Sequence, residues 1–154
     1  MAGTDLMVEA VESAPFAQNA YVVWRRGGRE ALVVDPGFDV DALVAALDRE
    51  GLEPAAILNT HGHADHIGGN AALKEAFPEA PLVIGRGDAN MLVDAEANLS
   101  APFGLALTSP PADRLVADGE RLTLAGLTFE VREIPGHSPG SVVPTAQVLR
   151  SRAN

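Results

Sequence analysis

The chain has no cysteine, little positive charge and no long apolar run, and each absence narrows its function. Without cysteine in 154 residues, disulfides and thiolate ligands are excluded, so nitrogen and oxygen would hold any metal. The 11 basic residues against 21 acidic ones give a formal net charge of -10, which disfavours nucleic acid as a partner. No segment can span a bilayer, and the amino terminus lacks the basic and apolar stretches of a signal peptide. We therefore expect no membrane association and a cytoplasmic location.

Strand-like and helix-like segments alternate along the chain, which indicates one α/β domain. The 47% hydrophobic content is sufficient for a single core. The stretch from residue 98 to 111, rich in Pro, Gly and Ser, is predicted to be a surface loop of the kind that borders active sites. Strands are expected over residues 20–24, 31–34, 55–58, 81–84, 121–124 and 127–134 and from residue 141, and helices over 40–47, 65–77 and 88–94.

The histidines are concentrated in two loops. Three of the four are His61, His63 and His66, which share the run THGHADH with Asp65, and the fourth is His137. Imidazole and carboxylate are ligands of divalent zinc, iron and manganese. His61 and His63, two residues apart, face the same side of an extended loop, and His66 can turn toward the same point. Asp65 supplies an anionic ligand, and His137, which is remote in the sequence, must arrive through the fold. The cluster favours a metal site over the alternative of purely structural histidines.

Both histidine loops are expected just beyond the ends of strands, where ligands of open α/β sheets collect. Asp35 lies in a similar position, directly after the strand over residues 31–34. Its carboxylate either supports the metal loops through hydrogen bonds or caps a turn, and both interpretations remain open.

Taken together, these motifs resemble those of the metallo-β-lactamase-fold hydrolases, and within them the glyoxalase II-like (hydroxyacylglutathione hydrolase-like) branch. The matching segments are VDPG at 34–37, THGHADHIGGN at 60–70, NLS at 98–100 and PGHSPGS at 135–141. They occur in the order that the family shows, so the resemblance covers most of the chain.

The resemblance implies an α/β (α+β) fold, the αββα sandwich, with one or two Zn²⁺ ions at one edge of the paired sheets. Iron and manganese are alternatives, since His and Asp serve all three metals. His61, His63 and His137 would hold the first metal. Asp65 and His66 would contribute to the second, and Asp65 is also the implied catalytic residue. The implied substrate is a small acyl or thioester molecule, whose carbonyl the metals polarise for attack by a water of lowered pKa.

After the His137 loop the sequence departs from this family, whose members continue with a bridging aspartate and a last histidine. Here no acidic residue follows Glu133 and no histidine follows His137. Pro144 is also expected to break the next strand. We therefore expect an incomplete metallo-β-lactamase-like domain over residues 1–143 and an atypical tail over 144–154, from a truncated or frameshifted gene end.

Three consequences are expected from this departure. The chain would bind one metal at best, and its activity would be low. One apolar sheet face would lack cover, which favours aggregation or a homo-oligomer that covers the face. The alternatives to a thioester hydrolase are an inactive metal-binding or interaction fragment and a non-haem iron sulfur dioxygenase-type enzyme. Thioester hydrolysis and iron-dependent oxygen uptake distinguish them.

Overall fold

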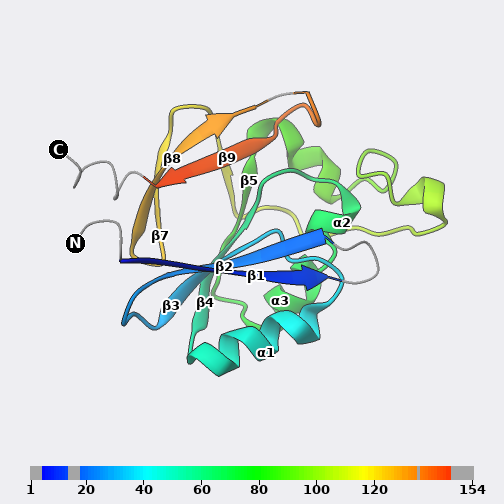
Figure 1. The fold of residues 1–154 in the computed structure, drawn as a ribbon. Helices are drawn as coiled ribbons and strands as arrows, with labels where there is room; N and C mark the ends of the chain where they lie inside the picture. The colour runs from blue at the N-terminus through cyan, green and yellow to red at the C-terminus, as the bar shows by residue number, and fades with distance from the viewer. Residues whose placement is uncertain (1–4, 14–17, 135, 147–154) are drawn as a thin grey trace.

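Two β-sheets and a layer of helices make up the fold (Figure 1). The computed structural model describes residues 5–13, 18–134 and 136–146, so Pro135 and most of the expected tail lie outside the described residues. In chain order the elements, with η for 3₁₀ helices, are β1 (Leu6–Ser13), β2 (Gln18–Arg25), β3 (Glu30–Val34), α1 (Val40–Glu50), β4 (Glu53–Asn59), α2 (Ala64–Ile67), α3 (Asn70–Ala76), β5 (Leu82–Gly85), η2 (Arg86–Leu92), η3 (Ala101–Phe103), β6 (Arg114–Val116), β7 (Arg121–Leu124), β8 (Leu127–Glu133) and β9 (Val142–Ala146).

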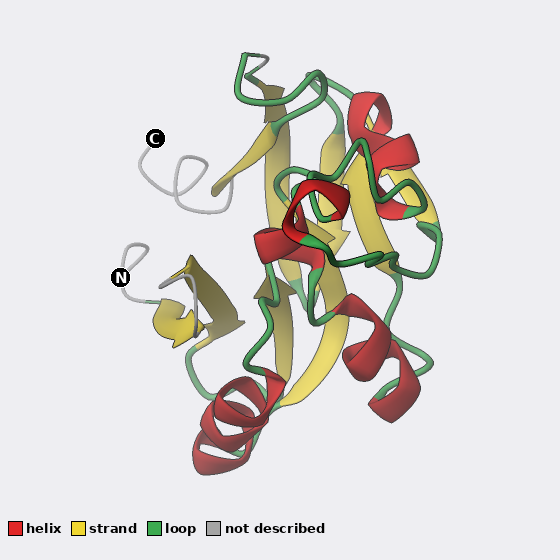
Figure 2. Ribbon diagram, turned by 90° about the vertical axis from the view of Figure 1, so that its right-hand side faces the viewer, coloured by secondary structure: helices red, strands yellow, loops and turns green. Residues whose placement is uncertain are grey.

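The larger sheet has the strand order β1-β2-β3-β4-β5-β6 and is buried on both faces. In β3, Ala31 and Val33 pack into the core beneath the helices, whereas Leu32 and Val34 pack into a second core on the opposite face. Successive side chains of a strand point to opposite faces, so a continuous apolar run predicts a sheet covered on both sides. Helices α1 and α3 cover the first face (Figures 1 and 2).

A smaller sheet with the order β7-β8-β9 covers the second face. Leu122, Leu127 and Phe129 of this sheet share a core with Leu32 and Leu58 of the larger one. The expectation of an uncovered apolar face is therefore wrong, because three strands between residues 121 and 146 suffice to cover it. No second copy of the chain is needed for that purpose.

Pro144 does not break the last described strand. It lies within β9, opposite Val131 of β8 in an antiparallel pair. Because β9 is at the edge of its sheet, the missing N–H of proline costs no hydrogen bond to a further strand. The expected boundary after residue 143 thus falls inside a strand, and residues 147–154 lie outside the described part of the chain.

The helix expected over residues 65–77 is divided into α2 and α3 at a pair of glycines. The N–H of Gly69 donates to the Pro36 carbonyl at 2.7 Å, and a Cβ at Gly69 would lie 2.5 Å from the Gly37 oxygen. The chain is therefore held against the loop that precedes α1. The helix expected over residues 88–94 is instead the 3₁₀ helix η2.

Most of the other expected elements are confirmed, including the β2–β3 hairpin and α1. The Asp39 side chain accepts a hydrogen bond from the Ala42 N–H at the start of α1, and Gly51 ends it with φ 67°. The edge strands β1 and β6 were not predicted, since β1 is half exposed, with Val8 56% exposed, and β6 has only three residues. None of the described helices has the length and apolar character needed to cross a membrane.

Candidate metal centre

Three neighbouring parallel strands, β3, β4 and β5, end at the same edge of the larger sheet. Asp35 follows the first strand, His61 and His63 follow the second, and Asp88 follows the third within η2. His137 arrives from the smaller sheet, in the loop between β8 and β9. Its ring centroid lies 4.7 Å from those of both His61 and His63. The fold thus brings together residues 74 positions apart, as the resemblance implied.

His61, His63 and His137 form a group whose candidate ligand atoms all lie within 4.8 Å of one another. The Nδ1 of His63 and the Nε2 of His137 are 3.1 Å apart. Two nitrogens bound to one tetrahedral zinc ion at 2.0–2.1 Å would be separated by about 3.4 Å. The donor set and its spacing therefore fit a divalent metal.

A hydrogen-bond chain leaves one nitrogen of His61 free as a ligand. The Thr60 hydroxyl donates to Asp35 Oδ2 at 2.6 Å, and the same hydroxyl oxygen lies 3.1 Å from His61 Nδ1. Since the hydroxyl proton is directed to Asp35, His61 Nδ1 carries the proton it shares with Thr60, and Nε2 keeps a lone pair. His61 Nε2 is buried and has no hydrogen-bond partner among the described residues. A buried nitrogen without a partner is costly, and a metal ion would satisfy it.

The surroundings of His61 and His63 disfavour a proton on either ring. Burial, reinforced by the neighbouring His66, lowers the pKa of His61 to about 4. Burial and His137 also lower the pKa of His63. Neutral imidazole is the form that binds metals, so these two side chains can act as ligands without first losing a proton.

Asp35 supports the histidine loop from behind. Its Oδ1 accepts a hydrogen bond from the Thr60 N–H at 2.7 Å, and its Oδ2 lies 3.1 Å from His66 Nδ1. Burial lowers the pKa of His66, but the hydrogen bond to Asp35 and the charges of Asp35 and Asp65 outweigh it, so the net pKa is raised. Of the two interpretations of Asp35, the structure favours support of the metal loop.

The two side chains that the resemblance implies for a second metal, Asp65 and His66, lie side by side. His66 also forms a candidate ligand group with His61 and Asp35. The Asp65 carboxylate is 38% exposed, and its Oδ2 lies 3.8 Å from His66 Nε2. Since Asp35 holds Nδ1 of His66, the Nε2 side faces Asp65.

Asp88 was not identified from the sequence, yet it joins the two histidine loops. Its carboxylate is fully buried and accepts hydrogen bonds from Gly62 N–H at 3.0 Å, the Ser138 hydroxyl at 2.6 Å and Gly140 N–H at 2.6 Å. Gly62 lies between His61 and His63, and Ser138 follows His137. An acidic residue after a buried strand was the only signal, and many surface turns share it.

The family model described as "Metallo-beta-lactamase superfamily" matches residues 13–150 of the chain. The chain belongs to the metallo-beta-lactamase superfamily. The fold expected from the resemblance is therefore confirmed, and the helix layer and both sheets of the sandwich are present.

Curated relatives within this superfamily include hydrolases. The chain is 35% identical to the probable metallo-hydrolase YqgX of Bacillus subtilis, covering 83% of this chain and 60% of that protein. It is 38% identical to a hydroxyacylglutathione hydrolase of Synechococcus sp., covering 74% and 37% respectively. The chain thus spans about 60% or less of the length of these relatives.

Two solved superfamily structures are especially similar. The BLEG-1 B3 metallo-beta-lactamase superposes with a TM-score of 0.85 at 39% identity, covering 92% of this chain and 68% of that one. A di-iron-bound form of TTHA1623 superposes with a TM-score of 0.75 at 36% identity, covering 90% and 67%. A B3 metallo-beta-lactamase and a di-iron-bound protein thus share this fold, so the fold alone does not select the chemistry.

Proposed function

We propose that this chain is a metal-dependent hydrolase of acyl thioesters, related to the hydroxyacylglutathione hydrolases. The observation that carries the proposal is the group of three histidines, in which His61 Nε2 is buried and lacks a hydrogen-bond partner in the described part of the chain. The 38% identity to the Synechococcus hydroxyacylglutathione hydrolase supports the substrate class. His61, His63 and His137 would hold the metal. We propose zinc as the metal, because histidine nitrogens coordinate it in tetrahedral geometry. Iron is the alternative, since TTHA1623 has a di-iron-bound form.

A bound divalent metal would supply a water of lowered pKa and polarise the acyl carbonyl. The chain's own residues orient the reaction. The Asp35–Thr60–His61 chain fixes the ring of His61. Asp65 lines the same pocket as His63, which supports a role for its carboxylate in orienting the attacking water and taking up its proton. That proton is then available to the departing thiolate.

We further propose that the residues of this chain hold one metal tightly and a second weakly, so that hydrolysis is slow. The three-histidine group resembles the three protein ligands of catalytic zinc sites. Around His66, the acidic neighbours are Asp35, already engaged by Thr60, and the partly exposed Asp65. Two closely spaced cations need an anion between them, and neither of these carboxylates is both unengaged and buried.

The test measures metal content and hydrolysis in one preparation. Tag-free protein, grown with zinc, iron and manganese, should contain about one metal per chain by mass spectrometry. It should hydrolyse short acyl thioesters slowly, and His61→Asn should lose both metal and activity. The control is Asp41→Asn, which changes an exposed residue of α1 and should retain both metal and activity. A metal-loaded protein no faster than His61→Asn on every thioester would overturn the proposal.

A second candidate is oxygen-dependent chemistry at iron, of the sulfur dioxygenase type, and the di-iron form of TTHA1623 favours it. Iron-loaded protein that consumes oxygen with a persulfide and leaves thioesters intact would support this candidate. If metal-loaded protein shows neither activity, the result would favour an inactive metal-binding chain.

A further inference from the structure

We propose that the pocket beside the histidine group selects an uncharged, apolar acyl group, with Leu99 and Phe38 as specificity-determining residues. The inference rests on the proposed thioester hydrolysis and names the acyl class on which the site would act. Three observations support this inference. They are the distribution of polar and apolar residues in the pocket, the backbone conformation of the loop that lines it and the position of one aromatic ring.

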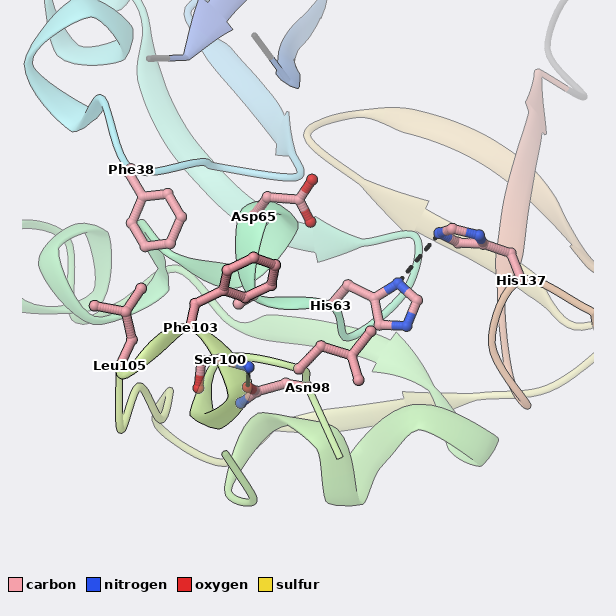
Figure 3. A pocket seen from close by; sticks show the side chains of 10 residues that line it. Phe38, His63, Asp65, Asn98, Ser100, Phe103, Leu105 and His137 are labelled. Carbon is pink, nitrogen blue, oxygen red and sulfur yellow. Dashed lines mark hydrogen bonds between the residues drawn. The ribbon is translucent and has the colours of Figure 1, made fainter. Parts of the chain in front are cut away.

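The pocket has two chemically different ends (Figure 3). It encloses about 210 Å³. His63 and His137 lie at one end, where the reacting carbonyl would be placed. Phe38, Phe103 and Leu105 line the other end. A thioester carbonyl at the histidines would therefore direct its acyl chain toward an apolar wall.

The polar residues of the 98–111 loop that line the pocket are engaged by backbone groups of the loop and of η2. The Asn98 amide donates to the carbonyls of Met91 and Leu107 at 3.0 and 2.9 Å. The Ser100 hydroxyl accepts from the Leu107 N–H at 3.1 Å. Neither lysine nor arginine appears among the described residues that line the pocket. A carboxylate on the acyl group would thus find no cation to pair with and would lose hydration on entry.

The loop backbone presents Leu99 to the pocket in a strained conformation. Leu99 has φ 69°, a region that non-glycine residues rarely adopt. Hydrogen bonds hold the residues on both sides: Ala64 N–H donates to the Asn98 carbonyl at 2.9 Å, and Ser100 N–H donates to the Asn98 side chain at 3.0 Å. Leu99 nevertheless remains 49% exposed while lining the pocket. Strain maintained to expose an apolar side chain points to a contact with a ligand rather than to core packing.

Phe38 is placed by a glycine of the histidine motif. A Cβ at Gly68 would lie 2.7 Å from two ring atoms of Phe38, so only glycine allows the ring to pack against the turn between α2 and α3. Gly68 is two residues after His66. The same short motif that supplies histidines therefore also positions one side of the apolar wall.

The expected signature is a dependence of rate on acyl length. Each methylene buried against this wall should raise kcat/KM about fourfold, until the small pocket is full. A succinyl group, which ends in a carboxylate, should be disfavoured relative to the butyryl group, which has the same number of carbons.

The experiment uses metal-loaded protein and acetyl, butyryl, hexanoyl and succinyl thioesters of one thiol, N-acetylcysteamine. Wild type should prefer butyryl to acetyl at least tenfold and reject succinyl. Leu99→Gly should reduce that preference severalfold without lowering Tm by more than about 2 °C, because glycine adopts a positive φ without the steric cost. Val93→Ala, which changes an exposed apolar residue outside the pocket (51% exposed), is the matched control and should leave the preference unchanged.

Binding of the free acids, measured by calorimetry on the same proteins, separates the two proposals. Tighter binding of hexanoate than acetate, lost in Leu99→Gly, would support the pocket even if no thioester is hydrolysed, in which case only the hydrolase proposal fails. Hydrolysis with equal rates for all acyl groups, or a preference that Leu99→Gly leaves intact, would overturn the pocket inference alone.

Discussion

Asp88 is the residue that joins the two halves of the candidate centre. One fully buried carboxylate accepts hydrogen bonds from both histidine loops, so the distance between His63 and His137 depends on it. Its three donors compensate the cost of burying a charge. Removing the charge leaves these buried donors with an incomplete hydrogen-bond partner.

Asp88→Asn should therefore lower the free energy of unfolding by about 2–3 kcal/mol and weaken metal binding at least tenfold. An amide presents N–H groups where the carboxylate oxygens accepted hydrogen bonds. Chemical denaturation and competition with a metal chelator measure the two effects. Asp94→Asn is the control, since Asp94 also accepts two backbone N–H bonds, from residues 96 and 97, but in an exposed turn. Equal losses in both variants would contradict the role of Asp88.

His61 makes the metal-free protein sensitive to acid. Its pKa is lowered from 6.5 to about 4, mainly by burial. Between those pH values the unfolded chain binds a proton that the folded chain does not, so stability falls as pH falls from 6.5 toward 4. His66, whose pKa is raised, acts in the opposite direction. The diagnostic is therefore the difference between wild type and His61→Asn.

Thermal unfolding of chelator-treated protein between pH 7.5 and 5 measures that difference. As the pH falls over this range, the Tm of wild type should decrease more than the Tm of His61→Asn. Identical slopes would show that the fold does not disfavour a proton on His61.

At the scale of elements, the His137 loop and η2 touch backbone to backbone. A Cβ at Gly140 would lie 2.5 Å from Gly87 Cα and 2.6 Å from Asp88 N, and a Cβ at Gly85 would lie 2.4 Å from the Gly140 oxygen. Glycine at these positions lets the loop between β8 and β9 approach the end of β5. The approach brings His137 to the histidines that follow β4.

Gly140→Ala should separate these elements and cost about 1–3 kcal/mol of stability, with a larger relative loss in metal affinity. Gly27→Ala is an informative comparison. Gly27 has φ 80°, and no atom lies within 4 Å of the place that an alanine Cβ would take. Alanine there therefore costs only about 1 kcal/mol of backbone strain and should leave metal affinity intact. If Gly140→Ala retains wild-type metal affinity, the close approach does not position His137.

At the scale of the whole molecule, stability is divided between two cores on opposite faces of the larger sheet. The helices cover one face, and the smaller sheet covers the other. The outer side of the smaller sheet carries polar groups such as Thr123 and Thr128, whose hydroxyls are 3.1 Å apart. The smaller sheet therefore directs its buried apolar side chains toward the larger sheet, as a cover should.

Leu122→Ala removes a fully buried side chain from the core between the sheets and should cost about 2–5 kcal/mol. Binding of a hydrophobic dye should be low in wild type and should increase in the variant. Thr123→Ala, on the outer face of the same strand, should change stability by less than about 1 kcal/mol. Strong dye binding by wild type would indicate that the smaller sheet does not cover the larger one in solution.

By itself, the sequence determined the local features of this protein. The β2–β3 hairpin, helix α1 with its Asp39 and Gly51 ends, and the buried run over residues 31–34 follow from turn chemistry and periodicity, which act over a few residues. The histidine motif likewise places His61, His63, Asp65 and His66 near one point, because they are close in the chain.

Only the tertiary structure decided what depends on contacts between distant residues. No periodic pattern in the sequence reveals the role of Asp88, the packing of Phe38 against Gly68 or the exposure of Leu99 in a strained conformation. The edge position that tolerates Pro144 depends on strand order rather than on composition. The arrival of His137 beside His63 requires both sheets to pack. Local sequence preferences determine the helices and strands, but the site forms where the ends of these elements come together. Burial of apolar side chains in the two cores brings those ends together.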